Sequence, residues 1–338
     1  MCENSREVAP RSFEEQASHR QLSLSKNLWT RLSSLAQVVI AIAAWIALAG
    51  VAHAQARLPI VATTTDLKSL AEAVGGDRVS VVALVPPNTD AEEYQPKPHD
   101  LNRLKDARLV LRVGVDYDLW LDRLVQQSGN REIARGGSGY VDCSFGIALL
   151  DVRGAQVGPS GGHAHGSGNP HYWLDPANAE MITAVIVEAL ARNDPRNAEY
   201  YGTQRARFLG RLADRVRQWE KTLAVAHGRP LLAYHNTWAY FARRFRLNFA
   251  GYIEPRPGVP PSPSQVAALI RIAQSQRVSV IVRQPHEPVA SVDFVSAKSG
   301  ARVVILASSV GAVPPASDYV GLLDYNVRTL AAAFREGL

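Results

Sequence analysis

The chain has 338 residues, of which 46% are hydrophobic and 20% are charged. This composition supports packed cores and argues against a disordered protein, and the length suits one large domain or two ordinary ones. The formal net charge is +6, but lysines and arginines are spread along the chain without a dense basic block. We therefore expect no nucleic-acid partner, and we expect a monomer.

The first 54 residues predict an export signal. Residues 1–34 are polar, residues 38–52 are continuously apolar, and Ala52-His53-Ala54 places small residues where signal peptides are cleaved. This pattern is typical of a secretory signal peptide, and the apolar run is short for a membrane span. We expect a periplasmic protein whose signal peptide covers residues 1–54. An uncleaved membrane anchor is the alternative.

The segment 55–192 predicts a first α/β lobe. Short apolar runs rich in β-forming residues indicate strands at 58–63, 79–85, 109–113 and 147–152. Helical spacing and helix-stop residues indicate helices at 66–74, 98–106, 117–127 and 177–191. Continuous apolar strands that alternate with helices are typical of a parallel sheet covered on both faces.

Residues 193–225 predict one long helix, because apolar side chains recur there at helical spacing for roughly 30 residues, or about 45 Å. The segment 226–338 then predicts a second α/β lobe. Strands are expected at 230–234, 248–253, 278–282 and 303–306, and helices at 237–246, 265–276, 290–299 and 326–335. The predicted fold class is α/β, with two similar parallel-sheet lobes joined by one long rigid helix.

Polar side chains follow several of the predicted strands. Glu92 comes after the second strand, His235 and Glu254 come directly after strands of the second lobe, and His171 lies in a stiff turn between two prolines. In open parallel sheets, ligands bind outside the carboxyl ends of the strands. Imidazole suits zinc, and carboxylate shifts the preference toward harder ions such as manganese. The sequence thus predicts a metal site in the cleft between the lobes. For His171, a packed histidine in a helix-start turn is the alternative.

Four motifs carry a resemblance to a known family. They read TTTDL at 63–67, DAEEYQPKP at 90–98, NPHYWLDP at 169–176 and YHNTWAYF at 234–241. From about residue 57 to the C-terminus, the chain resembles the periplasmic solute-binding proteins of metal-ion ABC importers, the zinc- and manganese-binding group called cluster A-I. The resemblance implies two α/β lobes joined by a long helix, with His171 and His235 as ligands.

The chain departs from that family pattern at two ligand positions. Members usually have a histidine where this chain has Glu92, and an aspartate where it has Ala307. A carboxylate can still coordinate, whereas an alanine cannot. The fourth ligand must come from elsewhere or be water, or the site has lost its metal. We predict Glu254 as this ligand. A loop acid paired with Arg256 is the alternative.

Four other candidates are weaker. We expect His286 and Glu287 on a solvated loop rim. His163 and His165 fit either a mobile loop that collects metal or a flexible linker with incidental histidines.

The predicted function is capture of a divalent transition-metal ion and its delivery to an ABC importer permease. Zn²⁺ is the first choice of cargo, and Mn²⁺ or Fe²⁺ are the alternatives. A metal-dependent hydrolase or oxygenase with a two-histidine, one-carboxylate site is a competing interpretation, as is a surface adhesin on the same fold. Against an enzyme, the sequence shows no convincing general base, no phosphate-cradling glycine loop and no Gly-x-Ser-x-Gly elbow.

Overall fold

The computed structural model describes residue 37 and residues 56–151, 168–254 and 258–335. Apart from residue 37, the predicted signal peptide lies outside the described residues, as do His163, His165 and Arg256. Residues 57–338 form one compact unit. Among the described residues, no helix combines the length and apolar character that a membrane span requires.

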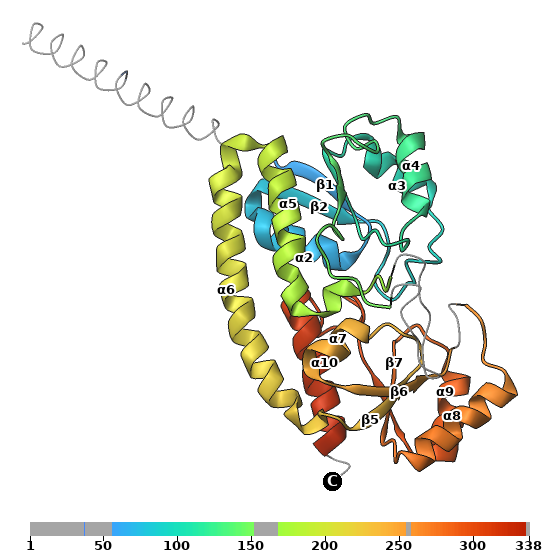
Figure 1. The fold of residues 1–338 in the computed structure, drawn as a ribbon. Helices are drawn as coiled ribbons and strands as arrows, with labels where there is room; N and C mark the ends of the chain where they lie inside the picture. The colour runs from blue at the N-terminus through green and yellow to red at the C-terminus, as the bar shows by residue number, and fades with distance from the viewer. Residues whose placement is uncertain (1–36, 38–55, 152–167, 255–257, 336–338) are drawn as a thin grey trace, which may run out of the picture. The chain divides into compact units, whose positions relative to one another are not determined.

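The first lobe is built on a four-stranded parallel sheet (Figure 1). Its strand order is β2-β1-β3-β4, and Ile60 of β1 lies opposite Val81 of β2 and Leu109 of β3. The apolar runs of these strands pair in register, so their side chains are buried between helices. The strands are β1 (Leu58–Ala62), β2 (Val79–Ala83), β3 (Leu109–Arg112) and β4 (Tyr140–Asp142), and the helices are α2 (Thr65–Gly75), α3 (Pro98–Lys105) and α4 (Trp120–Ser128).

The second lobe repeats this plan. Its four parallel strands lie in the order β6-β5-β7-β8, which is the same order as in the first sheet when each sheet is numbered from its own first strand. The predicted fold class is confirmed. The strands are β5 (Pro230–Ala233), β6 (Asn248–Tyr252), β7 (Val280–Arg283) and β8 (Arg302–Ile305), and the helices are α7 (Ala239–Phe245), α8 (Pro263–Ser275) and α9 (Val289–Ser299).

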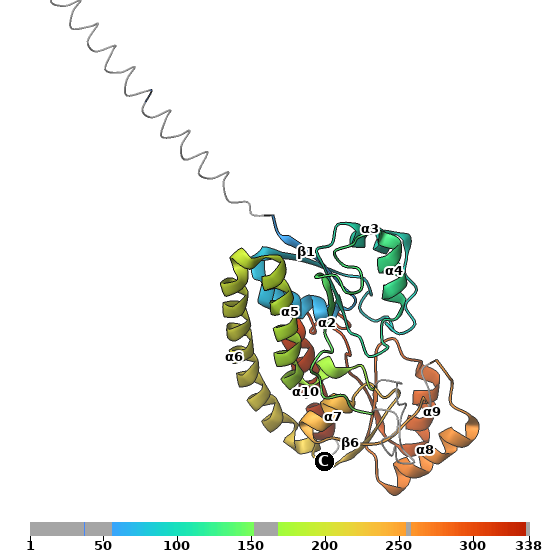
Figure 2. The ribbon, with the colours of Figure 1, turned by 45° about the horizontal axis from the view of Figure 1, so that its top comes forward.

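Three long helices, α5 (Ala179–Asn193), α6 (Ala198–Leu223) and α10 (Tyr319–Arg335), accompany the two sheets. The 26 residues of α6 span about 39 Å, and this helix packs against α2, α5 and α10 (Figures 1 and 2). Short 3-10 helices cover Gly76–Arg78, Tyr172–Leu174 (η2), Pro176–Asn178 (η3), Pro195–Asn197 and Ala224–Ala226.

The segment after β8 is tied to the first lobe rather than to the second alone. Val310 N donates to Oδ1 of Asp66 over 2.9 Å, and Tyr319 N donates to Oγ of Ser69 over 3.0 Å. Nε1 of Trp173 donates to the carbonyl of Ser308 over 2.8 Å. These bonds join residues that are far apart in the sequence, so the segment between β8 and α10 packs against the first lobe.

One predicted strand, 147–152, is wrong. The fourth strand of the first sheet is Tyr140–Asp142, which pairs with β3. The apolar residues from Ile147 to Leu150 are not paired in a sheet. Instead, Leu150 N donates to the Tyr240 hydroxyl over 3.1 Å, and Asp151 has a positive φ of 53°. The segment from Ile147 to Leu150 is apolar because it packs on the core as a loop. The strand β4 has only three residues, and it is too short to be recognised in a glycine-containing segment.

The last helix is longer than predicted. It begins at Tyr319, not at residue 326. The reason is Asp318, whose carbonyl accepts from Leu322 N over 2.8 Å and whose Oδ1 accepts from Gly321 N over 2.7 Å. An aspartate in this position satisfies backbone N–H groups of the first helical turn, so the helix starts one residue later.

Candidate metal centre

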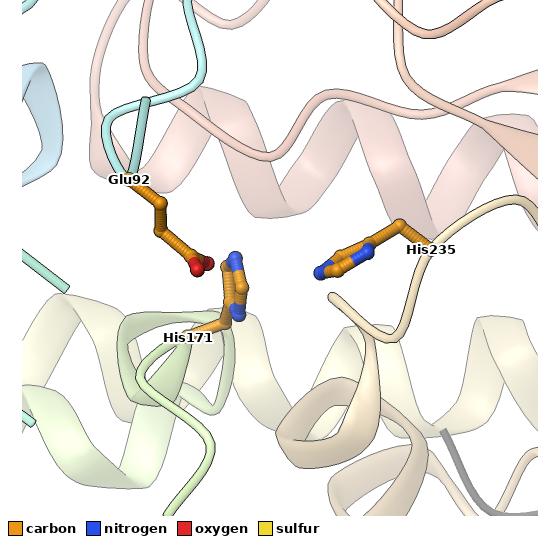
Figure 3. A group of neighbouring side chains, drawn as sticks. All are labelled: Glu92, His171 and His235. Atoms are coloured by element: carbon orange, nitrogen blue, oxygen red, sulfur yellow. The ribbon is translucent and has the colours of Figure 1, made fainter. Parts of the chain in front are cut away.

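Three of the four predicted ligands converge in the cleft. Glu92, His171 and His235 each offer one ligand atom, and these atoms all lie within 4.8 Å of one another. Figure 3 shows the three side chains pointing toward one another from three separate segments. Glu92 comes from the loop after β2, His171 immediately precedes η2, and His235 follows β5. The group therefore draws on both lobes.

The first donor, Glu92, is held by its neighbour Asp90. Oδ1 of Asp90 accepts from Glu92 N over 2.9 Å, which is a local turn typical of aspartate. Burial raises the pKa of Glu92 to about 7, the negative charge of Asp90 adds to the rise, and His235 opposes it. Without a bound cation, the Glu92 carboxyl group is therefore partly protonated near neutral pH.

The second donor, His171, is buried and held on both its backbone and its ring. Oδ1 of Asn169 lies 3.0 Å from His171 N and 3.2 Å from Nδ1. An amide oxygen only accepts, so Nδ1 carries the proton and Nε2 carries the lone pair that binds metal. The ring also packs edge-on to Tyr117, with centroids 5.4 Å apart.

Both Glu92 and His171 follow an Asx residue by two positions, and in each case the Asx side chain accepts the donor's backbone N–H. Asp90 and Asn169 are not among the residues expected from the sequence. The spacing Asx-x-donor in DAE and NPH is the sequence signal that could have identified them.

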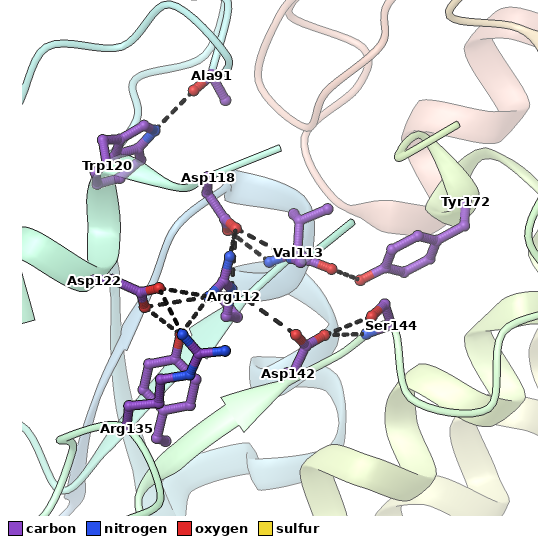
Figure 4. A network of polar contacts seen from close by, with 12 residues as sticks. Ala91, Arg112, Val113, Asp118, Trp120, Asp122, Arg135, Asp142, Ser144 and Tyr172 are labelled. Carbon is purple, nitrogen blue, oxygen red and sulfur yellow. Dashed lines mark hydrogen bonds and ion pairs between the residues drawn. The ribbon is translucent and has the colours of Figure 1, made fainter. Parts of the chain in front are cut away.

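A buried polar network supports the first lobe behind His171 (Figure 4). The Tyr172 hydroxyl donates to the carbonyl of Val113 over 2.8 Å, and Val113 N donates to Oδ2 of Asp118 over 2.7 Å. Oδ1 of Asp118 lies 3.2 Å from the guanidinium of Arg112. Burial raises the pKa of Asp118, and Arg112 opposes the rise. The network fixes the end of β3 where the His171 segment docks.

The third donor, His235, is held by Glu254. Nδ1 of His235 lies 2.6 Å from Oε2 of Glu254, and both side chains are largely buried. Burial lowers the pKa of His235, but the hydrogen bond and charge of Glu254 outweigh it, so the net pKa is raised. Since Nδ1 is engaged, Nε2 is left to face the cleft.

Glu254 itself stands behind His235 and outside the group of three. Its Oε1 accepts from Gly258 N over 3.0 Å. Both carboxylate oxygens are thus engaged with protein groups.

Ala307, where the family that the chain resembles usually has an aspartate, offers no side-chain donor. Its N–H donates to Oδ1 of Asn326 over 2.9 Å, and its carbonyl accepts from Nδ2 of Asn326 over 2.7 Å. Both the N–H and the carbonyl group of Ala307 are therefore hydrogen-bonded to the Asn326 side chain.

The expectation that Glu287 lies on a solvated rim is wrong. Its side chain is only 5% exposed, and its carboxylate accepts from N and Nε2 of Gln284 over 2.5 and 2.9 Å. Burial raises the pKa of Glu287 to about 7, although the bond from Gln284 N opposes the rise. His286, in contrast, is exposed at the cleft wall and lies outside the group of three.

The cleft around the group holds about 270 Å³, which is room for an ion with several water molecules at about 30 Å³ each. Its lining combines the three donors with polar groups of both lobes, among them Thr65, Gln284 and Ser309. A neutral-imidazole and carboxylate set of this kind is a donor set for first-row divalent metals.

Comparison with known proteins places this chain among metal-uptake proteins. The family model described as "Zinc-uptake complex component A periplasmic" matches residues 60–333. The iron-binding protein YfeA of Yersinia pestis is 25% identical over 287 residues, covering 82% of this chain and 86% of its own. The high-affinity zinc uptake system protein ZnuA of Bacillus subtilis is 22% identical, covering 81% and 86%. A crystal structure of ZnuA superimposes with a TM-score of 0.71 and 26% identity, covering 82% of this chain and 99% of that one.

Proposed function

This chain belongs to the family of periplasmic A components of zinc-uptake complexes, and on that premise we propose that it captures a divalent transition-metal ion at Glu92, His171 and His235. The observation that carries the proposal is the convergence of these three donors within 4.8 Å. Each imidazole has its Nδ1 engaged, at Asn169 and at Glu254, so both present Nε2 to the same space.

Zinc is the cargo we favour. Two imidazoles and one carboxylate form a common zinc set with one position left open. The carboxylate at Glu92 makes the site harder than an all-histidine site, so Mn²⁺ and Fe²⁺ are the competing ions. The relatives include both an iron-binding and a zinc-uptake protein, which supports a site whose metal preference depends on the ratio of histidine to carboxylate ligands.

Capture requires no chemical step. The ion displaces the proton that Glu92 holds near neutral pH. The Asn169 amide and the Glu254 carboxylate orient the two histidines so that the Nε2 lone pairs point toward the ion. Because the donors come from both lobes, a bound ion links the lobes, and release must separate them. We propose that the membrane permease of an ABC importer receives the ion.

We further propose the segment boundaries that the sequence predicts. Residues 1–54 act as the signal peptide that directs the chain to the periplasm, residues 55–192 and 226–338 form the two lobes, and residues 193–225 connect them. Supporting this division, each lobe segment contains one complete parallel sheet.

The test is direct titration of the purified chain with Zn²⁺, Mn²⁺ and Fe²⁺, read by calorimetry and by competition with a chelator. We expect one ion per chain, and we expect His171→Ala and His235→Ala each to weaken binding by more than the about 10–100-fold that loss of an outer-shell partner costs. Unchanged affinity in both variants would refute the site. Metal-dependent turnover of an ester or peptide would favour an enzyme instead.

A further inference from the structure

One histidine in the cleft has no role in the site described so far. His286 lies in the loop between β7 and α9 and lines the same cleft as Glu92, His171 and His235. We propose that His286 is a further metal ligand, which closes the coordination sphere of the bound ion from the second lobe. This inference rests on the proposed function, because it concerns the same ion.

The three converging donors leave a tetrahedral ion one position short. The second-lobe carboxylates beside them are engaged elsewhere: Glu254 with His235 and Gly258, and Glu287 with Gln284. On the first lobe, Asp90 accepts from Glu92 N and Asp66 accepts from Val310 N, each through one oxygen, and the other oxygen of Asp66 has no hydrogen-bond partner among the described residues. Ala307 offers no side-chain donor. Within the second lobe, the His286 imidazole is thus a donor with no hydrogen bond to break.

The side chain of His286 is uncommitted. Within residues 56–151, 168–254 and 258–335, it takes part in no hydrogen bond, ion pair or ring contact. The residues on both sides of it, in contrast, are anchored. Nη1 of Arg283 donates to the carbonyl of Gln284 over 2.9 Å, and Glu287 N donates to the same carbonyl over 3.3 Å. Ring rotation about a fixed backbone is thus the movement available to this residue.

The charges around His286 suit a ligand. Asp90 faces it from the first lobe, and His235 and Glu254 lie within electrostatic reach on the second. Partial desolvation in the cleft lowers the pKa of His286, although the residue is exposed, and the charge of Asp90 opposes this. The ring is therefore neutral at neutral pH, and neutral imidazole is the form that binds metal.

The ring nitrogens of His286 stand outside the group whose atoms lie within 4.8 Å of one another. Coordination therefore requires the ring to turn inward when the ion arrives. Such a turn brings a donor of the β7–α9 loop onto an ion already held by Glu92 and His171 of the first lobe. His286 would then add a second tie, beside His235, between the ion and the second lobe.

The test compares His286→Ala with His227→Ala, a control that removes an exposed histidine outside this cleft. Zn²⁺ affinity is measured by chelator competition, and the number of imidazole ligands is measured by X-ray absorption at the zinc edge. We expect three imidazoles in the parent and in His227→Ala, and two in His286→Ala, with affinity lower by about 10-fold or more. Thermal unfolding of the metal-free variants shows whether each one folds.

An unchanged imidazole count and affinity in His286→Ala would overturn the inference and assign the fourth position to water or another side chain. If that result comes with strong losses in His171→Ala and His235→Ala, only this inference fails. If those two variants also bind zinc as the parent does, the proposed function fails as well.

Discussion

Oε2 of Glu254 lies 2.6 Å from Nδ1 of His235, on the side of the imidazole that faces away from Glu92 and His171. A carboxylate in this place fixes the tautomer and the orientation of a metal-binding histidine and raises its basicity. In this arrangement, Glu254 would act on an ion bound at the proposed site through His235.

Replacement of Glu254 tests this arrangement. We expect Glu254→Ala to lower Zn²⁺ affinity about 10–100-fold, the range for loss of an outer-shell partner. Glu254→Gln should lose less, because its amide oxygen still accepts from Nδ1–H. Glu188→Gln, an exposed acid on α5, serves as the control. Equal, large losses in both Glu254 variants, together with one oxygen fewer around zinc by X-ray absorption, would instead make Glu254 a direct ligand.

Metal binding should weaken in acid because Glu92 must lose its proton to coordinate. Its pKa is raised to about 7 in the metal-free protein, so binding below that pH has to displace a proton. We expect affinity to rise from about pH 5 to about pH 8 and to level off above. Calorimetry in buffers of different ionisation enthalpy counts the protons released. The variant Glu92→Gln should release fewer at neutral pH, and equal release would contradict the assignment.

Asp66 predicts a pH-dependent cost in stability. Its carboxylate is fully buried, and burial raises its pKa from 3.8 to about 7. The folded state therefore holds a proton that the unfolded state loses, so stability declines as pH rises from about 4 through about 7. Asp66→Asn should be more stable than the parent by about 4 kcal/mol at about pH 8, since the shift from 3.8 to about 7 is about 3 pKa units and each unit corresponds to about 1.4 kcal/mol. The gain should vanish only below about pH 4, where Asp66 is protonated in both states, and thermal unfolding of the metal-free protein measures it. A gain independent of pH would contradict this explanation.

The buried pair of Arg112 and Asp118 predicts a large loss of stability when it is broken. Asp118 is 0% exposed and Arg112 is 6% exposed, so Asp118→Ala leaves a buried guanidinium and the N–H groups of Val113 and Gly114 without that partner. We expect a loss of about 3–5 kcal/mol in urea unfolding. The exposed pair of Asp214 and Arg217 is the matched control, and Asp214→Ala should cost less than about 1 kcal/mol. Similar losses of stability in the two variants would contradict the prediction, because they would show that burial does not raise the cost of breaking the Arg112–Asp118 pair.

The sequence by itself determined the architecture and the place of the site along the chain. Alternating apolar strands and helices predicted two parallel-sheet lobes, because the periodicity of burial is a local property of each segment. Glu92 and His235 follow predicted strands, and ligands of open parallel sheets bind outside the carboxyl ends of the strands. The ligand role of His171 was implied by the family resemblance of its NPHYWLDP motif. The structure brings both histidines to one point with Glu92.

Only the tertiary structure decided what each polar side chain faces. Glu254 follows a strand as His235 does, yet its carboxylate turns onto that histidine instead of into the group of three. Glu287 and His286 are neighbours in sequence, yet one is buried against Gln284 and the other is exposed in the cleft. The run from Ile147 is as apolar as a strand, yet it covers the core as a loop. Side-chain direction depends on segments that are far apart in sequence, and no local pattern carries that information.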